Sequence, residues 1–375
     1  SINPDDLDFS DLEPVKARIG DARLVLLGAR TAASSEARAR FVEFLHERMG
    51  FDVVAFDAAF FDGERLDERL GGAASVDGKF LKDVFSGRNE PAVVADYAQK
   101  TRRSARPLRV AGYGFAASPV MERDLAAALF EFLGRAAPQL AESAGRKSIQ
   151  SLVAKAAPGN SSSAPRVSGA QWAALQNLIA ALTPEAFPPA EARRASLFRR
   201  SLQNLAMALQ WRDRTIRALR GERGSVSMNF AQEKLAENLA WLAKTWYPDR
   251  KIMVWAGANA MLLRGLAGVT PHRPGAGNMP TMGDLITREF AGQTYSLAFT
   301  SPNDPALPFV PEGTDEPFLE DLLARVGKPY LFLDLHSAAP EHWLRQSLPA
   351  RVLGGPAIAD WSAAFDGIFY VDPLR

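Results

Sequence analysis

Asp334 and His336 are the residues whose types and spacing could most directly support chemistry. They lie two positions apart at the end of an apolar run, Tyr330 to Leu335, that predicts a β-strand. Side chains at positions i and i+2 of a strand point to the same face. An aspartate and a histidine on one face could bind a metal or act as acid and base, and a hydrogen bond at the strand end is the structural alternative. No third ligand type lies nearby, so we predict no metal site and no cofactor.

The other motifs of common enzymes are missing. The chain has four histidines and no cysteine, which excludes thiolate nucleophiles, disulfides and Cys-type zinc sites. It contains no G-x-S-x-G nucleophile motif and neither of the glycine-rich phosphate loops. His46 lies outside the apolar stripe of its predicted helix, so we expect it to face solvent.

The chain opens with a predicted strand, helix and strand. Arg23 to Leu27 and Phe51 to Phe56 are short apolar runs bounded by turn residues, and the segment between them carries apolar residues at helical spacing. A right-handed crossover of this kind joins two parallel strands, and ligands of such sheets bind where the strands end. Residues 28–34 and 57–61 therefore lie where chemistry is expected.

Further strands are predicted along the chain, separated by helices. They are Leu108 to Ala111, Lys251 to Trp255, Thr294 to Phe299, Tyr330 to Leu335 and an edge strand, Gly367 to Val371. This alternation predicts an α/β fold with a mostly parallel central sheet flanked by helices. We expect residues 1–135 and 250–375 to form the α/β core, and residues 136–249 a helical insertion. The insertion includes a connection over Arg146 to Ala170, flexible at 155–168, because its PGNSSSAP core cannot hold a helix.

Composition narrows the class of protein. The chain has 375 residues, of which 47% are hydrophobic and 23% charged, with a net charge of +1. That balance gives no electrostatic reason to expect nucleic acid, and we expect the clustered Arg193, Arg194, Arg199 and Arg200 to form a solvated helix face. No apolar run reaches the ~20 residues that a bilayer span needs. The start resembles no signal peptide, which favours a cytoplasmic protein, although a leader could already have been removed.

The order of short motifs resembles the erythromycin esterase-like family, which includes macrolide esterases and proteins labelled as succinoglycan biosynthesis proteins. The family opens with a strand that is followed by the motif Leu-Gly-Glu-Ala-Thr-His-Gly-Ser/Thr. A helix comes next, and then a second strand that ends in Phe-Glu. This chain follows the same pattern in the segment IGDARLVLLGARTAASSEARARFVEFLHERMGFDVVAFDA. The resemblance continues in NFAQEKLAENLAWLAKTWYPDRK, KIMVWAGANAMLLR, TMGDLITREFAGQTYSLAFTS, and YLFLDLHSA through AFDGIFYVDP. It implies an esterase-type α/β fold over nearly the whole chain.

The polar residues of the family motifs are largely replaced. Ala29 and Ala32 stand where the family has Glu and the His implied to be its general base, and Gly257 and Ala260 best match two further histidine positions. Asp57 keeps a carboxylate at the second-strand Glu position. The family's Gly-Phe-Asp is Gly112-Tyr113-Gly114, and its Arg-Asp pair is Ala231-Gln232. A general base contributes ~10²- to 10⁴-fold in rate, and alanine cannot accept a proton.

Three functions remain open. A pseudoenzyme would bind a small molecule or partner through Arg30, Thr31, Asp57, Tyr113, Gln232 and Asn259 without hydrolysing it. A hydrolase with relocated chemistry would act on an ester or lactone through Asp57, Asp334 and His336. A non-catalytic interaction protein would use the helical segment from Gln171 to Trp246 as its contact surface.

Overall fold

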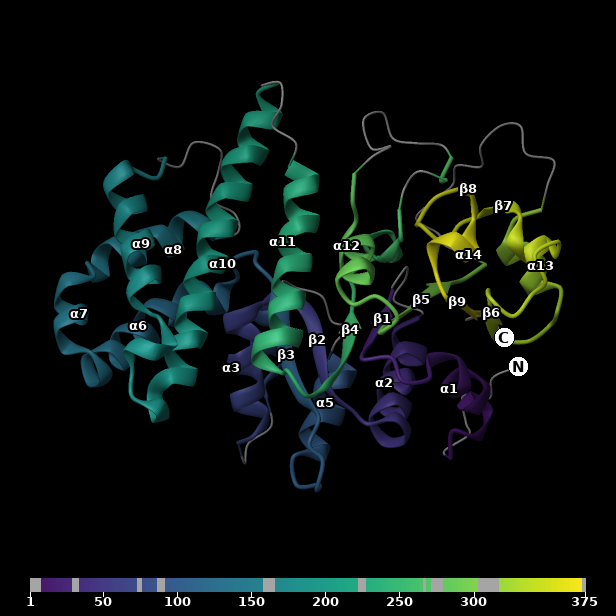
Figure 1. The fold of residues 1–375 in the computed structure, drawn as a ribbon, viewed down its shortest axis with the longest axis horizontal. Coiled ribbons are helices and arrows are strands. Elements are labelled where there is room, and N and C mark those ends of the chain that lie inside the picture. The colour runs from purple at the N-terminus through teal and green to yellow at the C-terminus, as the bar shows by residue number, and fades with distance from the viewer. Residues whose placement is uncertain are drawn as a thin grey trace. The chain divides into compact units, whose positions relative to one another are not determined.

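The computed structural model describes residues 8–28, 34–72, 76–85, 92–157, 166–221, 227–265, 268–270, 279–302 and 317–372, and these residues include a seven-stranded sheet. The strand order is β3-β2-β4-β1-β5-β9-β6. The strands are β1 (Leu24–Leu27), β2 (Phe51–Ala59), β3 (Arg109–Gly114), β4 (Lys251–Trp255), β5 (Thr294–Thr300), β6 (Tyr330–Asp334) and β9 (Gly367–Val371). The predicted α/β fold with a mostly parallel sheet is confirmed (Figure 1).

The place of β9 corrects one prediction. β1 pairs in parallel with β4 and β5, β5 pairs in parallel with β9, and β6 pairs antiparallel with β9. β9 is therefore an interior strand with every residue buried, and β6 takes the edge. Its continuous apolar sequence is typical of a strand covered on both faces. A separate antiparallel pair, β7 (Ser347–Ala350) and β8 (Ala357–Asp360), was not predicted.

The chain divides into two compact units. Unit 1 comprises Ser1–Ala55, Glu90–Arg109 and Leu239–Arg375, and unit 2 comprises Phe56–Asn89 and Val110–Asn238. The predicted division at residues 135 and 249 stays a prediction. The helices of unit 1 are η1 (Ser10–Leu12), α1 (Glu13–Ile19), α2 (Ser35–Met49), α5 (Ala92–Thr101), η4 (Leu242–Trp246), η5 (Asn259–Leu262), α12 (Met282–Glu289), α13 (Leu319–Ala324), η6 (Trp343–Arg345) and α14 (Trp361–Ala364).

The core of unit 1 forms where α2 packs on the sheet. The Phe41 ring lies 5.7 Å from that of Phe299 on β5 and 4.9 Å from that of Phe369 on β9, edge-on in both cases. All three side chains are buried. Edge-to-face aromatic pairs add to the free energy gained by burial, so this contact fixes α2 on one face of the sheet.

His46 is buried, which corrects the expected solvent exposure. Its Nδ1 lies 2.8 Å from the Tyr97 hydroxyl on α5, and its Nε2 lies 2.9 Å from the carbonyl oxygen of Arg106. Because a carbonyl only accepts, Nε2 carries a proton. Burial lowers the pKa of His46, and the Arg106 guanidinium acts in the same direction. His46 therefore ties α2 to α5.

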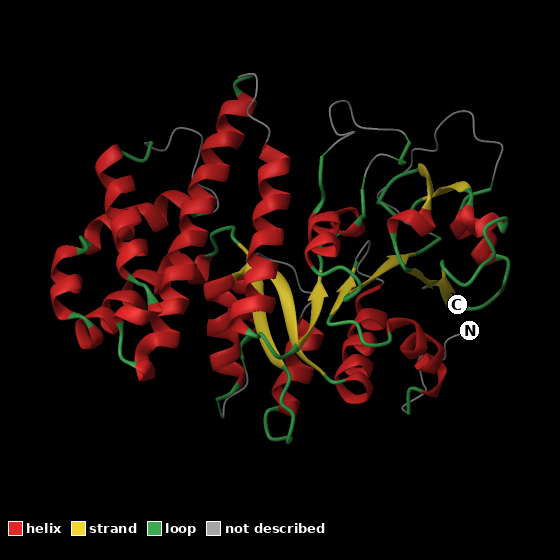
Figure 2. Cartoon of the chain, in the orientation of Figure 1, coloured by secondary structure: helices red, strands yellow, loops and turns green. Residues whose placement is uncertain are grey.

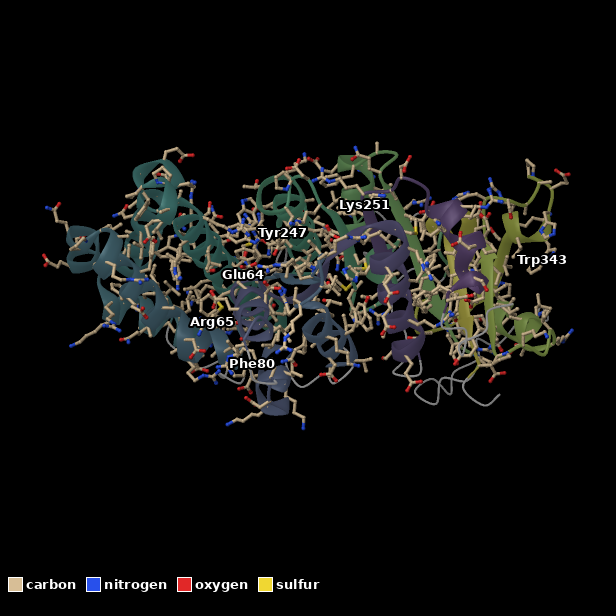
Figure 3. All side chains as sticks on the ribbon, turned by 90° about the horizontal axis from the view of Figure 1, so that it is seen from below. Glu64, Arg65, Phe80, Tyr247, Lys251 and Trp343 are labelled. Atoms are coloured by element: carbon tan, nitrogen blue, oxygen red, sulfur yellow. The ribbon has the colours of Figure 1, made fainter. Side chains whose placement is uncertain are left out.

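Unit 2 combines the second part of β2 and most of β3 with helices, drawn in red in Figure 2. Its helices are α3 (Phe60–Leu70), α4 (Gly78–Val84), α6 (Pro119–Ala136), α7 (Pro138–Ser143), α8 (Arg146–Ala156), α9 (Gly169–Ala181), η3 (Pro184–Ala186), α10 (Pro189–Leu219) and α11 (Ser227–Trp241). Phe80 of α4, labelled in Figure 3, is buried, and the Arg69 guanidinium lies 3.8 Å from its ring centroid.

Helix α8 corrects part of the predicted flexible connection. Residues Arg146–Ala156 form a helix that buries Ile149, Leu152 and Val153. These residues have the i, i+3, i+4 spacing of an amphipathic helix, which outweighs the turn-forming residues that follow them. Residues 158–165, which are the PGNSSSAP core, lie outside the described part of the chain.

Glycines let α3 approach β3 closely. A Cβ atom added to Gly63 would lie 2.1 Å from the Gly112 nitrogen, and one added to Gly112 would lie 2.3 Å from the Ala59 carbonyl oxygen. Backbone meets backbone here, so neither contact can be relieved by turning a side chain. This approach positions the carboxyl ends of β2 and β3.

We expect Gly63→Ala to lower the free energy of unfolding by about 3 kcal/mol, because the helix must move away from the strand. Gly134→Ala is the matched control, since Gly134 is exposed on α6 with nothing within 4 Å of an added Cβ. It should raise stability by about 0.5–1 kcal/mol through helix propensity. Urea unfolding of both variants measures the difference, and equal effects would contradict the proposed close packing.

Candidate ligand site

In unit 2, polar side chains lie around the backbone carbonyl of Gly114, at the end of β3. The carbonyl oxygen of Gly114 accepts a hydrogen bond from Nδ2 of Asn204 on α10 and from Nδ2 of Asn238 on α11, each at 3.2 Å. Both asparagines are buried. Since parallel α/β sheets bind ligands at the carboxyl ends of their strands, this is a suitable place for a site.

Arg200 completes this cluster. Its Nη2 donates a hydrogen bond to Oδ1 of Asn238, its Nη1 donates to Gln203 at 3.3 Å, and Glu237 lies 3.6 Å away. Burial lowers the pKa of Arg200 to about 10, and Glu237 opposes that shift. Arg200 is 5% exposed, so the expectation that it belongs to a solvated face was wrong. We call Arg200, Asn204, Asn238 and the Gly114 carbonyl the Gly114 site.

Three predicted ligand-binding residues also belong to unit 2. Asp57 lies half-buried on β2, and its Oδ1 is 2.9 Å from the place that a Cβ atom on Gly114 would occupy. The Asp57 carboxylate is therefore beside the Gly114 site. Tyr113 is fully buried on β3, and Gln232 is half-buried on α11.

Asn259 lies in unit 1, where its side-chain amide forms hydrogen bonds with backbone atoms of other segments. Its Nδ2 donates to the carbonyl oxygens of Phe299 at 2.6 Å and Val352 at 2.7 Å, while its Oδ1 accepts from the Phe299 nitrogen at 3.1 Å. A Cβ atom on Gly28 would collide with this amide at 2.0 Å. Asn259 thus joins the ends of β1 and β5, and its predicted role in ligand binding stays a prediction.

Arg30 and Thr31, with Ala29 and Ala32, lie outside the described residues. Gly257 and Ala260, at the other two expected histidine positions, are exposed.

Asp334 and His336 have separate side-chain partners. The Asp334 carboxylate pairs with Nε of Arg18 at 2.5 Å and accepts from the backbone nitrogen of His336 at 3.0 Å. The His336 ring lies between Asp366, 3.2 Å from Nε2, and Nη1 of Arg345, 3.2 Å from Nδ1. Because a guanidinium only donates, Nδ1 accepts and Nε2 carries the proton that reaches Asp366. Both ring nitrogens are therefore occupied. Asp57 belongs to unit 2 and these residues to unit 1.

Sequence reasoning missed several buried polar residues. Asn204 follows Arg200 by one helical turn within an otherwise apolar face of α10, and this spacing was an available signal. Arg38 on α2 is fully buried, 3.8 Å from the Trp255 ring centroid, and donates to the carbonyl oxygen of Ala256 at 3.0 Å. Nothing in its local sequence distinguishes it from a surface arginine.

The described residues contain no group of three or more His, Asp or Glu side chains placed to hold a metal ion. They also contain no helix that is both long and apolar enough to cross a bilayer.

A family model described as erythromycin esterase matches residues 46–373, which is most of the chain. The chain belongs to the erythromycin esterase family. This confirms the resemblance found in the sequence.

Relatives of this esterase-family chain include enzymes by name. It is 24% identical over 353 residues to the "Putative hydrolase YbfO" of Bacillus subtilis (strain 168), a match covering 87% of this chain and 77% of that protein. A shorter match, 32% identical over 88 residues, is to the "Erythromycin esterase type II" of Escherichia coli and covers 22% of this chain and 21% of that protein.

Solved structures share the esterase-family fold. A mutant of the erythromycin esterase EreC in its open conformation has a TM-score of 0.72 at 19% identity, covering 99% of this chain and 95% of that one. A succinoglycan biosynthesis protein has a TM-score of 0.74 at 16% identity, and a Bacillus cereus protein 0.78 at 15%. Each of these two matches covers 99% of this chain and 93% of the other. At these identities the likeness shows the fold alone.

Asp62 is a fully buried carboxyl group in the first turn of α3 in this esterase-family chain. Burial raises the pKa of Asp62 to about 8, and the Ser118 side chain opposes part of that shift. The group therefore holds a proton at neutral pH in the folded protein, whereas an unfolded aspartate is ionised above pH ~4.

Because the folded state binds the extra proton, the free energy of unfolding should fall as pH rises from ~4 to ~8, by about 1.4 kcal/mol per pH unit. Asp62→Asn should remove this contribution. Denaturant unfolding of both proteins at pH 6 and pH 8 tests it, with Asp77→Asn as a control at an exposed position. A wild-type pH slope that survives in Asp62→Asn would show that Asp62 is ionised in the folded protein.

Proposed function

We propose that this member of the erythromycin esterase family binds a small molecule at the Gly114 site without hydrolysing it. The observation that carries the proposal is the chemistry of that site: two buried amides donate to one backbone carbonyl, and a buried guanidinium donates to the oxygen of one of these amides. Such groups orient a polar ligand by hydrogen bonds. None of them accepts a proton from water at neutral pH.

The sequence supports the same proposal. Ala29, Ala32, Gly257 and Ala260 stand where the resemblance implies one glutamate and three histidines. Asp57 keeps a carboxylate beside the site, without the histidines that the resemblance implies. Binding through hydrogen bonds survives these replacements, whereas proton transfer does not.

A hydrolase with relocated chemistry is the second candidate. The relatives named as hydrolase and esterase favour it, as does the contact between His336 and Asp366 at 3.2 Å, since His336 is partly exposed. Against it, Arg345 occupies Nδ1 and Asp366 occupies Nε2. His336 could act as a base only after Arg345 had moved away.

We expect the purified chain to cleave neither erythromycin nor p-nitrophenyl acetate faster than buffer. Product formation followed by mass spectrometry for the macrolide, and by absorbance for the nitrophenyl ester, measures this. Enzymatic turnover that disappears in Asp57→Asn or His336→Gln would overturn the binding proposal and support the relocated hydrolase.

Binding needs its own measurement. A thermal-shift screen of small polar molecules should find compounds that raise the melting temperature of the wild-type chain and have little effect on Asn204→Leu. Asn177→Leu is the matched control, because Asn177 lies exposed on α9. Compounds that stabilise all three proteins equally bind elsewhere, which would contradict the role given to the Gly114 site.

A further inference from the structure

Strand β6 lies at one edge of the seven-stranded sheet and pairs with β9, antiparallel to it (Figure 1). Four of its five residues are half-buried, whereas every residue of β9 is buried. Edge strands are commonly protected by lysine, proline or a bulge. β6 contains no lysine and no proline, and its register with β9 is unbroken. An edge strand of this kind can accept a further strand.

The hydrogen bonds to β9 show which backbone groups of β6 point outward. The carbonyl oxygen of Pro329 accepts from the nitrogen of Asp372 at 2.8 Å, and the nitrogen of Leu335 donates to the carbonyl oxygen of Asp366 at 3.2 Å. Because the direction of these groups alternates along a strand, the odd-numbered residues of β6 face β9 and Phe332, at its centre, faces outward. The backbone N–H and C=O of Phe332 bond to no other described residue.

We propose that β6 pairs with β6 of a second copy of this chain, antiparallel and about a two-fold axis at Phe332. Each Phe332 N–H then donates to the Phe332 carbonyl oxygen of the other copy, and the two sheets become one. Because Phe332 is the middle residue of β6, this register pairs the whole strand. The interface belongs to unit 1 and is independent of the Gly114 site in unit 2.

The residues around the axis are complementary to their own copies in this register. Leu331 lies opposite Leu333 of the second copy, so apolar side chains meet across the strands. Lys328 is exposed and lies diagonally across from Asp334 of the second copy. The Asp334 carboxylate, which pairs with Arg18 of its own copy, thereby gains a second cation. An ammonium group faces a carboxylate in this way at both ends of the interface.

Sedimentation velocity of the full chain at increasing concentration tests the inference. The wild type should change from monomer to dimer by ~100 μM, a concentration that populates even a weak dimer. A wild type that stays monomeric throughout would overturn the inference.

Phe332→Pro removes the outward N–H and spares the hydrogen bonds to β9, because the nitrogen of residue 332 does not face β9. It should be monomeric where the wild type is a dimer. Phe332→Val is the matched control, since it also shortens the side chain but keeps the N–H, and it should still form the dimer. Equal association of these two variants would contradict backbone pairing at Phe332.

The charge at the ends of the interface has a separate test. Lys328→Glu brings two carboxylates together at each end and should weaken dimerisation about tenfold. Lys147→Glu, at an exposed position of α8, makes the same change in net charge and should leave dimerisation unchanged. If both substitutions have the same effect, the proposed register is wrong.

Hydrogen exchange of the wild type needs no variant and decides the matter if Phe332→Pro does not fold. The peptide covering residues 328–336 should exchange more slowly at a concentration that favours the dimer than after dilution. Exchange that does not depend on concentration would overturn the inference even where a dimer forms, because that dimer would use another surface.

Discussion

The carbonyl of Gly114 is the constraint on which the polar interior of unit 2 depends. It lies at the end of a buried strand and accepts hydrogen bonds from two asparagine amides, one on α10 and one on α11. A buried carbonyl without partners costs more than the ~1 kcal/mol that a satisfied one contributes. The two helices are thereby held at one end of β3, and Arg200 enters the interior because Asn238 offers it an oxygen.

The groups of the Gly114 site donate and accept hydrogen bonds but do not exchange protons near neutral pH. Amides and guanidinium groups keep their protonation state across physiological pH, so a site made of them offers fixed donors and acceptors. A site that activates water needs a group that changes its protonation state near neutral pH. The imidazole of His336 is a group of that kind in unit 1, where its two nitrogens contact Asp366 and Arg345.

Much of the fold followed from local pattern. The strand limits at Lys251–Trp255 and Gly367–Val371 match the sequence prediction, whereas α8 forms where a flexible connection was predicted. The position of a strand within the sheet could not be predicted from local pattern. Gly367–Val371 was predicted at the edge of the sheet, yet it lies between β5 and β6. An apolar run indicates that a strand is buried. Which strands lie beside it in the sheet depends on segments that are far away in the chain.

The sequence by itself determined the α/β class and the family, because both are a matter of residue type at local spacing. Only the tertiary structure decided which polar residues are buried together. Asn204 and Asn238 reach Gly114 across 90 and 124 residues, and His46 and Arg200 are buried although their neighbours in sequence predict exposure. Burial of a polar side chain depends on partners brought by other elements, and local periodicity carries no information about them.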